Sequence, residues 1–263
     1  MEFRDIIYTK DNEGVATITL NRPQTLNALT DRMRDEWVAA IEDAKADDNV
    51  RVLVVTGIGR AFCSGANPRE LDRRIQDDSE STGIRRTGRW DIPEALAEFD
   101  KPYIGAINGP AAGGGMDLAS MCDIRIASDQ ARFGMRYIRM GTTPGMAGGY
   151  FLPRIIGNAR ACELIWTGRM IDAEEALRIG YVSKVVPHDQ LMPATREFAL
   201  QLAKGPAVAI RLSKRLIYDC WDMGLKQALK AHDEAQAITR ATEDAKEGPR
   251  AWVEKREPNF KGR

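Results

Sequence analysis

YIGAINGPAAGGGMDLASMCDIRI, the stretch from Tyr103 to Ile126, decides how the rest of this chain is organised. An apolar run typical of a β-strand, Tyr103–Ile107, leads through a turn to three adjacent glycines, Gly113–Gly115, and then to a helical segment. Glycines let another group approach the main chain closely. Here they also open a helix, whose first N–H groups lack intrahelical partners and whose dipole favours negative charge. The stretch is therefore suited to holding an oxyanion.

One carboxylate, Asp117, follows Gly114 by one helical turn and lies on the same face. It is a candidate for chemistry beside the glycines. The alternative interpretation is a glycine-rich turn that packs tightly, with Asp117 stabilising the helix dipole. The motif alone leaves both interpretations open.

A second glycine-containing segment, AFCSGAN at Ala61–Asn67, follows an apolar run and precedes Pro68, which suits a helix start. Alone it is a weak signal, because a turn after a strand needs small residues in any case. Together with the later glycines, Gly113–Gly115, the segment becomes informative about function. Two strand ends that each offer a free backbone N–H form a two-donor hole for one carbonyl oxygen.

Composition limits the classes of function. The 263 residues suffice for one large domain, or for a core with a small appendage. Basic and acidic residues number 38 each, a balance that lends no support to nucleic-acid binding. Four scattered cysteines and two histidines indicate neither a disulfide framework nor a metal site. Because no apolar run reaches membrane-spanning length and no signal peptide is visible, we expect no membrane partner and a cytoplasmic location.

Apolar periodicity predicts an order of elements typical of a repetitive α/β core. The predicted strands are Phe3–Tyr8, Val15–Leu20, Arg51–Gly57, Tyr103–Ile107, Ile124–Ala127 and Tyr181–Val186. A helix is predicted to start after Thr30, with Met33, Trp37, Ile41 and Ala44 on one face. Further helices are predicted at 91–99, 116–121, 172–180, 190–203, 206–222 and 225–242. Residues 73–90 read as a mobile loop and 133–149 as a long loop, whose length indicates a function.

The chain resembles the crotonase (enoyl-CoA hydratase/isomerase) superfamily over essentially its whole length. The matching segments are NRPQTLNAL (21–29), AFCSGAN (61–67), INGPAAGGGMDLASMCD (107–123), FGMRYIRMGTTPGMAGG (133–149), GRMIDAEEALRIGYVSKVV (168–186) and the tail AWVEKREPNF (251–260). The resemblance implies a spiral of ββα units over residues 1–200, with the acyl-CoA site. A helical C-terminal region, 201–263, is then expected to mediate a homotrimer, or a hexamer built from two trimers.

The resemblance also implies roles for individual residues. The oxyanion-hole donors fall on the backbone N–H groups of Ala66 and Gly114, which would bind the thioester oxygen of an acyl-CoA. Coenzyme A enters as part of the substrate, and no separate cofactor is expected. Its binding positions are Leu26, Ala28 and Arg69, together with Trp252 and Lys255, which match tail positions that reach the coenzyme A of a neighbouring subunit. A solvated helix charge is the alternative for Arg69, and plain packing is the alternative for Trp252.

The two expected catalytic positions depart from the family pattern. Hydratases of the family use two glutamates, but this chain has Asp117 at the first position and Tyr137 at the second. The aspartate reaches about 1.5 Å less than a glutamate would. Dienoyl-CoA isomerases of the family also carry aspartate there, although their third carboxylate falls on Thr143-Pro144 in this chain and is missing. A phenol is a poor base at neutral pH but can donate a proton or a hydrogen bond.

Four other charged side chains near these positions have two interpretations each, and one cysteine has a single interpretation. Arg136 and Arg139 flank Tyr137 and either meet a carboxylate on the acyl group, or face solvent or pair with acidic residues between subunits. Glu70 and Asp72 either supply the missing carboxylate or lie on a solvated helix. Cys63 reads as a small packed residue.

These observations predict an enzyme that acts on an acyl-CoA thioester through an oxyanion-stabilised enolate. Hydration and dehydration of 2-enoyl-CoA come first, because this is the commonest activity of the family. The alternatives are isomerisation of an enoyl- or dienoyl-CoA and hydrolytic cleavage of a C–C bond in a β-keto acyl-CoA. A non-catalytic acyl-CoA-binding protein is the alternative from another class.

Overall fold

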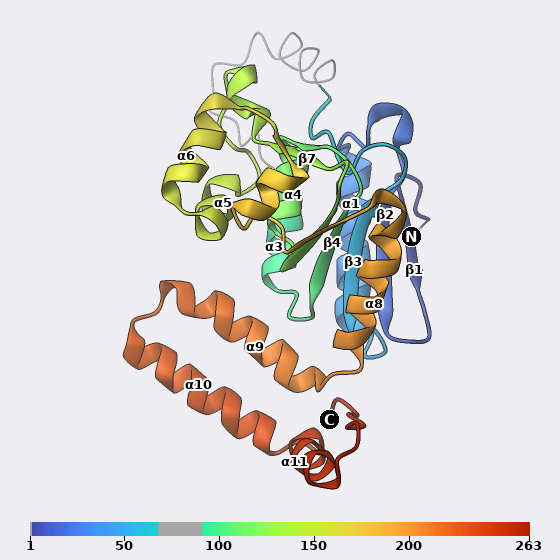
Figure 1. The fold of residues 1–263 in the computed structure, drawn as a ribbon, viewed down its shortest axis with the longest axis vertical. Helices are drawn as coiled ribbons and strands as arrows, with labels where there is room; N and C mark the ends of the chain where they lie inside the picture. Colours follow the sequence, from blue (N-terminus) through green and yellow to red (C-terminus); the bar gives the residue numbers. More distant parts are fainter. Residues whose placement is uncertain (1, 68–90) are drawn as a thin grey trace.

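Parallel strands form the centre of the molecule in the computed structural model, which describes residues 2–67 and 91–263 (Figure 1). In this part of the chain a six-stranded sheet has the order β1-β2-β3-β4-β6-β9, in which only the β1–β2 pair is antiparallel. The strands are β1 Ile6–Lys10, β2 Val15–Leu20, β3 Val52–Gly57, β4 Tyr103–Ile107, β6 Ile124–Ser128 and β9 Lys184–Val186. A smaller sheet has the order β5-β7-β8, with β5 Ala111–Ala112, β7 Arg132–Gly134 and β8 Ile171–Asp172.

Both faces of β3 are buried, which explains its continuous apolar sequence VLVVTG. Leu53 and Val55 belong to one apolar cluster, on the side of helix α1 (Asp31–Ala46). Val52 and Val54 belong to a second cluster, on the side of helix α8 (Leu191–Ala203). Since successive side chains of a strand point to opposite faces, one strand serves both layers. Figure 1 shows α1 and α8 on opposite sides of the sheet.

Helix α1 confirms the predicted N-cap and apolar face. The Thr30 hydroxyl accepts a hydrogen bond from the Met33 amide at 2.9 Å, and so satisfies one of the free amides of the first turn. Met33, Trp37, Ile41 and Ala44 are all buried. Their spacing of three or four residues places them on one stripe against the sheet.

The chain alternates between the two sheets. After β4 it enters β5 and then helix α4 (Gly114–Ser120). After β6 it enters β7, the 3₁₀ segment η2 (Arg136–Met140) and helix α5 (Gly148–Ile156). β4 and β6 are thus each followed by a small-sheet strand and a helix, and β5 pairs in parallel with β7. The repeat places the segments after β3, β4 and β6 side by side. The remaining described helices are α3 Asp91–Ala97, α6 Asn158–Thr167, α7 Ala173–Arg178, α9 Ala207–Asp219, α10 Leu225–Arg240 and α11 Asp244–Glu254.

The first strand begins later than predicted, at Ile6 rather than Phe3. The reason is Glu36 on α1, whose buried carboxylate accepts hydrogen bonds from the amides of Arg4, Asp5 and Ile6 at 2.8–3.0 Å. These amides therefore pair with a side chain instead of a neighbouring strand. The last strand is also shorter than predicted, because the Tyr181 ring enters the core and only Lys184–Val186 pair.

The predicted loop at 133–149 is wrong for much of its length. It contains the end of β7, the 3₁₀ segment η2 and the start of α5. Its glycines led to the loop prediction, but Gly134 closes a strand and Gly148 opens a helix. The tail is likewise helical as far as Glu254, within α11. The predicted loop at 73–90 lies outside the described residues.

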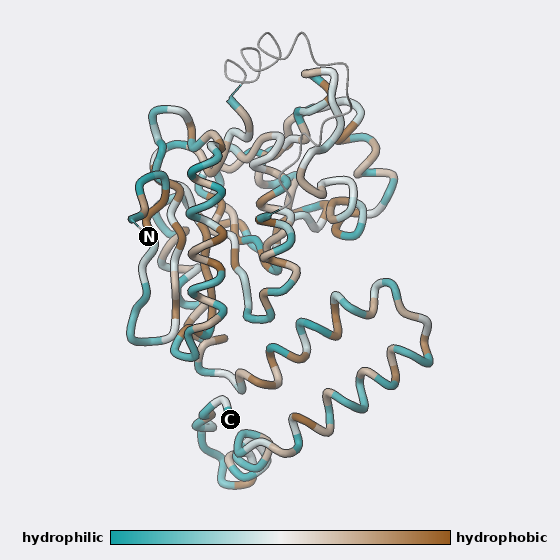
Figure 2. Tube along the Cα trace, turned by 180° about the vertical axis from the view of Figure 1, so that it is seen from behind, coloured by the Kyte–Doolittle hydropathy of each residue, from teal (hydrophilic) through white to brown (hydrophobic). Residues whose placement is uncertain are grey.

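Helices α9 and α10 form an antiparallel hairpin that lies apart from the sheets, with α11 at its end (Figure 1). Side-chain contacts attach α9 to the core: Arg211 pairs with Asp100 at 2.6 Å and Lys214 with Asp123 at 2.9 Å. Apolar residues recur along the two helices in Figure 2, and Leu225, Leu229 and Ile238 on α10 are exposed. The expected domain boundary at residue 200 falls within α8. In the described ranges, no helix has the length and apolar character needed to cross a membrane.

Candidate active site

The two glycine-containing segments meet at one place. The Leu29 amide donates to the Gly65 carbonyl at 2.8 Å, and the Ala112 amide donates to the Cys63 carbonyl at 3.0 Å. Gly65 has φ +79°, and a Cβ added to it would lie 2.8 Å from the Gly114 amide nitrogen. Only glycine permits this approach. The segment after β3 therefore lies directly against the first turn of α4.

The backbone N–H groups of Ala66 and Gly114 have no acceptor within the described ranges. Gly114 is the first residue of α4, so its N–H has no intrahelical partner. Ala66 forms a parallel bridge with Leu29, in which the neighbouring Gly65 supplies the carbonyl, so the Ala66 amide points away from residue 29. Two adjacent, unused donors are what an oxyanion requires.

Asp117 lies one turn into α4 and is fully buried. Its Oδ2 accepts a hydrogen bond from the Tyr137 hydroxyl at 2.6 Å and a second from the Met146 amide at 3.0 Å. Tyr137 comes from η2, and Met146 precedes α5. Two elements that follow β7 therefore hold one oxygen of a carboxyl group on α4.

Burial raises the pKa of Asp117 to about 6, while the hydrogen bonds from Tyr137 and Met146 act in the opposite direction. Burial and the nearby Asp117 charge raise the pKa of Tyr137 well above its usual value of 10. Tyr137 is therefore a protonated donor at neutral pH. A carboxyl group with a pKa of about 6 can act as both an acid and a base at a pH near that value.

The other carboxyl oxygen, Asp117 Oδ1, has no hydrogen-bond partner among the described residues. It faces Gly148 so closely that a Cβ there would lie 2.0 Å away. The Tyr137 hydroxyl lies 3.5 Å from the position that a Cβ on Gly114 would occupy. The carboxyl–phenol pair and one of the two free amides are thus neighbours, and one buried carboxyl oxygen has no hydrogen-bond partner among the described residues.

Comparison with known proteins decides the family. The sequence model of the enoyl-CoA hydratase/isomerase family matches residues 10–263. The chain belongs to this family. The predicted crotonase resemblance is therefore confirmed.

Similar proteins extend over the full length of this family member. It is 38% identical over 261 residues to a probable enoyl-CoA hydratase of Mycobacterium tuberculosis, with 99% of each chain covered. It is 37% identical to the short-chain-enoyl-CoA hydratase of Clostridium acetobutylicum, with 100% of each covered. A crystal structure of a putative enoyl-CoA hydratase/isomerase from Mycobacterium abscessus superposes with TM-score 0.93 at 32% identity, over 98% of this chain and 100% of the other. The α/β fold with C-terminal helices is thus a crotonase fold, as predicted.

The fold of this family member brings six predicted site residues together. Besides Ala66, Gly114, Asp117 and Tyr137, these are Leu26 and Ala28, from the segment whose Leu29 bridges to Ala66. The Leu26 carbonyl accepts a hydrogen bond from the Ser64 amide at 3.0 Å, which joins its segment to the one that carries Ala66. Leu26 and its neighbour Asn27 both have positive φ, which turns the chain sharply beside the site.

The remaining predicted residues lie elsewhere. Trp252 is 86% exposed on α11, and Lys255 ends that helix; Figure 1 shows α11 far from α4 within one chain. The predicted residues Arg69, Glu70 and Asp72 lie outside the described ranges. Arg139 is exposed, and Arg136 donates to the Gly168 carbonyl at 2.9 Å. Cys63 is fully buried, in line with the packing interpretation, and burial raises the pKa of its thiol to about 12.

Sequence reasoning missed two contributors, Met146 and Gly148. Met146 contacts Asp117 through its backbone amide, and a main-chain contact cannot be inferred from the type of the residue. Gly148 belongs to the long segment for which a function was expected, but only the fold shows that it touches Asp117. The close approach depends on how α5 returns to α4, which is a tertiary contact.

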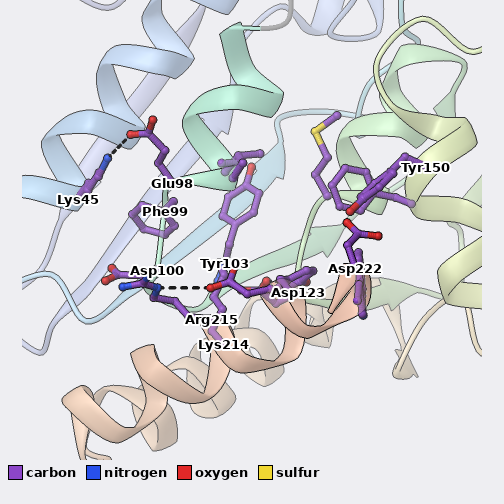
Figure 3. Close-up of a pocket in the computed structure, with 17 residues that line it drawn as sticks. Lys45, Glu98, Phe99, Asp100, Tyr103, Asp123, Tyr150, Lys214, Arg215 and Asp222 are labelled. Carbon is purple, nitrogen blue, oxygen red and sulfur yellow. Dashed lines mark hydrogen bonds and ion pairs between the residues drawn. The ribbon is translucent and has the colours of Figure 1, made fainter. Parts of the chain in front are cut away.

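A cavity of about 580 Å³ lies between the core and α9, away from this site (Figure 3). It is lined by charged groups that already have partners: Lys45 pairs with Glu98 and Lys214 with Asp123, both within 2.9 Å. Asp117 and Tyr137 are not among its lining residues. The cavity is therefore separate from the candidate active site around Asp117.

Proposed function

We propose that this protein adds water reversibly to 2-enoyl-CoA thioesters, through an enolate stabilised by backbone N–H groups. The observation that carries the proposal is the hydrogen-bonded pair of the buried Asp117 and the partly buried Tyr137 beside the free Gly114 amide. The similar proteins support the same reaction, since several are named enoyl-CoA hydratases and one from Syntrophomonas wolfei is named a crotonyl-CoA hydratase.

The amides of Ala66 and Gly114 bind the thioester oxygen in the proposed mechanism. When the oxygen of the deprotonated water adds to the β-carbon, the electrons of the double bond move toward the thioester. Negative charge then develops on the thioester oxygen. Donors already in place cost no reorganisation at that moment. Each is worth about 3–4 kcal/mol in sites of this kind.

Asp117 moves the protons. Its carboxylate takes a proton from the attacking water through Oδ1, and the carboxylic acid then returns a proton to the α-carbon. Tyr137 holds Oδ2 and so orients the carboxyl group, a role that suits a phenol whose pKa is raised. A group with a pKa of about 6 serves in both directions near neutral pH.

Coenzyme A is part of the substrate in this proposal, and its path runs along Leu26 and Ala28, with Arg69 toward the phosphates. Trp252 and Lys255 are too far from Asp117 in their own chain and would act on the site of another copy. We therefore include self-association as a homotrimer or hexamer. The exposed apolar residues of α10 support it. A cytoplasmic location remains a prediction.

Isomerisation of the double bond is the second candidate. One observation favours it: Asp117 is the single carboxyl group beside the free amides in the described ranges. Moving a proton from one carbon to another needs one acid–base group, whereas the family's hydratases use two.

The deciding experiment is crotonyl-CoA hydration, followed by loss of the conjugated-enoyl absorbance, with Asp117→Asn beside the wild type. We expect turnover that falls roughly 10²- to 10⁴-fold in the variant, because the amide neither takes nor returns a proton. Asp189→Asn, at an exposed aspartate of η3 (His188–Gln190), is the control. Wild-type turnover on a 3-enoyl thioester without hydration would favour isomerisation instead. Unchanged turnover in Asp117→Asn would reject both.

A further inference from the structure

The carbonyl oxygen of Ala61 is a junction between three segments. It accepts hydrogen bonds from the side-chain amides of two asparagines, Asn27 Nδ2 at 2.8 Å and Asn108 Nδ2 at 3.2 Å. The two asparagines are far apart in sequence. Both are buried, Asn27 completely.

Each asparagine uses its oxygen as well as its nitrogen. Asn27 Oδ1 accepts from the Arg22 amide at 2.8 Å, and Asn27 Nδ2 also donates to the Ile58 carbonyl. Because a backbone N–H only donates and a carbonyl only accepts, the orientation of this side-chain amide is fixed.

Asn108 is held in the same manner. Its Oδ1 accepts from the Gly57 amide at 3.1 Å, and its Nδ2 also donates to the Gly59 carbonyl at 2.9 Å. Both asparagines therefore bind the loop after β3 at several points, and Ala61 is the point that they share.

The three segments lead directly to the candidate hole. Ala61 begins the segment that carries Ala66, and Asn108 precedes the glycines that carry Gly114. Asn27 precedes Leu29, which bridges to Ala66. The separation of the two hole amides thus depends on how these segments are joined at Ala61.

The surroundings leave little room for adjustment. A Cβ on Gly57 would lie 2.5 Å from the Ala61 oxygen, and a Cβ on Gly109 would lie 3.0 Å from the Ala61 Cα. The backbone around the junction is packed against itself, so a shift of Ala61 must move its neighbours.

We propose that Asn27 and Asn108 are positioning residues that set the spacing of the Ala66 and Gly114 amides through the shared Ala61 carbonyl. This inference rests on the proposed function, in which those amides hold the thioester oxygen. Asparagine suits the task because a single planar group offers one acceptor and two donors. Aspartate has no donor at neutral pH, and serine has one.

The test uses Asn108→Ala and Asn108→Ser, in which Asn27 still binds the Ala61 carbonyl and supports folding. The first readout is the split between kcat and KM for the enoyl thioester. The second is the near-ultraviolet absorbance of acetoacetyl-CoA bound as its enolate, which reports the hole without turnover. We expect kcat to fall roughly 10- to 100-fold in the alanine variant, since small misplacements of catalytic groups have effects of this size.

The control is Thr56→Val. The Thr56 hydroxyl is buried and donates to the Ala106 carbonyl at 2.8 Å, so the variant also loses a buried hydrogen bond to backbone, but none to Ala61. We expect it to lower thermal stability while kcat and the enolate absorbance stay near wild type. Asn108→Ala should keep its affinity for coenzyme A itself within about twofold.

Three outcomes overturn the inference. One is a kcat and an enolate absorbance in Asn108→Ala that match the control. Another is an affinity for coenzyme A that falls as far as the enolate absorbance, which would show a general structural role. The third is a wild type that binds no enolate, because the Ala66 and Gly114 amides would then not form an oxyanion hole. If the wild type binds the enolate but hydrates no enoyl thioester, the proposed function alone is rejected. The enolate absorbance of Asn108→Ala, compared with the wild type and the control, then still tests the inference.

Discussion

At the Asp117 side chain, burial and hydrogen bonding change the pKa in opposite directions. Burial is the larger effect and raises the pKa, whereas the bonds from Tyr137 and Met146 lower it. The result is about 6, where a carboxyl group is both a usable base and a usable acid. In the proposed mechanism the chemistry thus depends on contacts made by one carboxyl oxygen, while the other has no partner among the described residues.

Tyr137→Phe should move the acid limb of the pH profile of kcat/KM to higher pH. The Tyr137 bond stabilises the Asp117 carboxylate, so its loss leaves burial less opposed and raises the pKa of Asp117 above about 6. Since the carboxylate form takes the proton from water in the proposed mechanism, activity should fall most on the acid side.

Tyr8→Phe is the matched control, because Tyr8 also donates to an aspartate, Asp43 at 2.9 Å, in an exposed pair away from the site. Its pH profile should equal that of wild type. An acid limb that stays in place in Tyr137→Phe would show that the phenol does not set the pKa of Asp117.

At the scale of elements, the start of α5 closes over Asp117. Gly148 lies against the carboxyl group, whereas its neighbour Gly149 has open space where a Cβ would lie. Two adjacent glycines on one helix therefore differ in what a methyl group would meet.

Gly148→Ala should reduce kcat roughly 100-fold, because the added Cβ would lie 2.0 Å from Asp117 Oδ1 and must displace the carboxyl group or the helix. Gly149→Ala should be near wild type in activity. Steady-state kinetics of both variants, with thermal unfolding to verify folding, make the comparison. Equal activities would mean that α5 can shift without disturbing the site.

At the scale of the whole molecule, the helical hairpin is joined to the core by α9 and leaves an apolar face of α10 exposed. Leu225 is 76% exposed and Leu229 is 55% exposed, although both are large apolar residues. In the proposed assembly a second copy covers them and brings Trp252 and Lys255 to a neighbouring site.

Leu229→Asp should shift the protein toward monomers in analytical ultracentrifugation, because a buried, unpaired carboxylate is costly in an interface. If Trp252 and Lys255 act across that interface, KM for the thioester should rise in parallel. Lys226→Ala, on the same helix at an exposed charge, is the control. A wild type that is monomeric at all concentrations would contradict the assembly.

The sequence was a good guide to local structure. Residue spacing predicted α1 with its Thr30 cap, and apolar runs predicted β2 and β4 with their observed bounds. Glycine content misled at 133–149, because a glycine that closes a strand or opens a helix has the same local signature as one in a loop. Polar contacts at long range, such as Glu36 with the amides before β1, were invisible.

The sequence by itself indicated the six strands of the large sheet in their order along the chain, the family and the identity of the groups that could do chemistry. The strands and the chemical groups follow from periodicity and residue type, which are local properties, whereas the family follows from the resemblance of whole motifs to a known superfamily. Only the tertiary structure decided that Tyr137 donates to Asp117, that Gly148 closes over it and that two asparagines meet at Ala61. Such contacts join residues distant in sequence, and their distances arise from the packing of β3, β4 and β6 with their connections, so no local pattern encodes them.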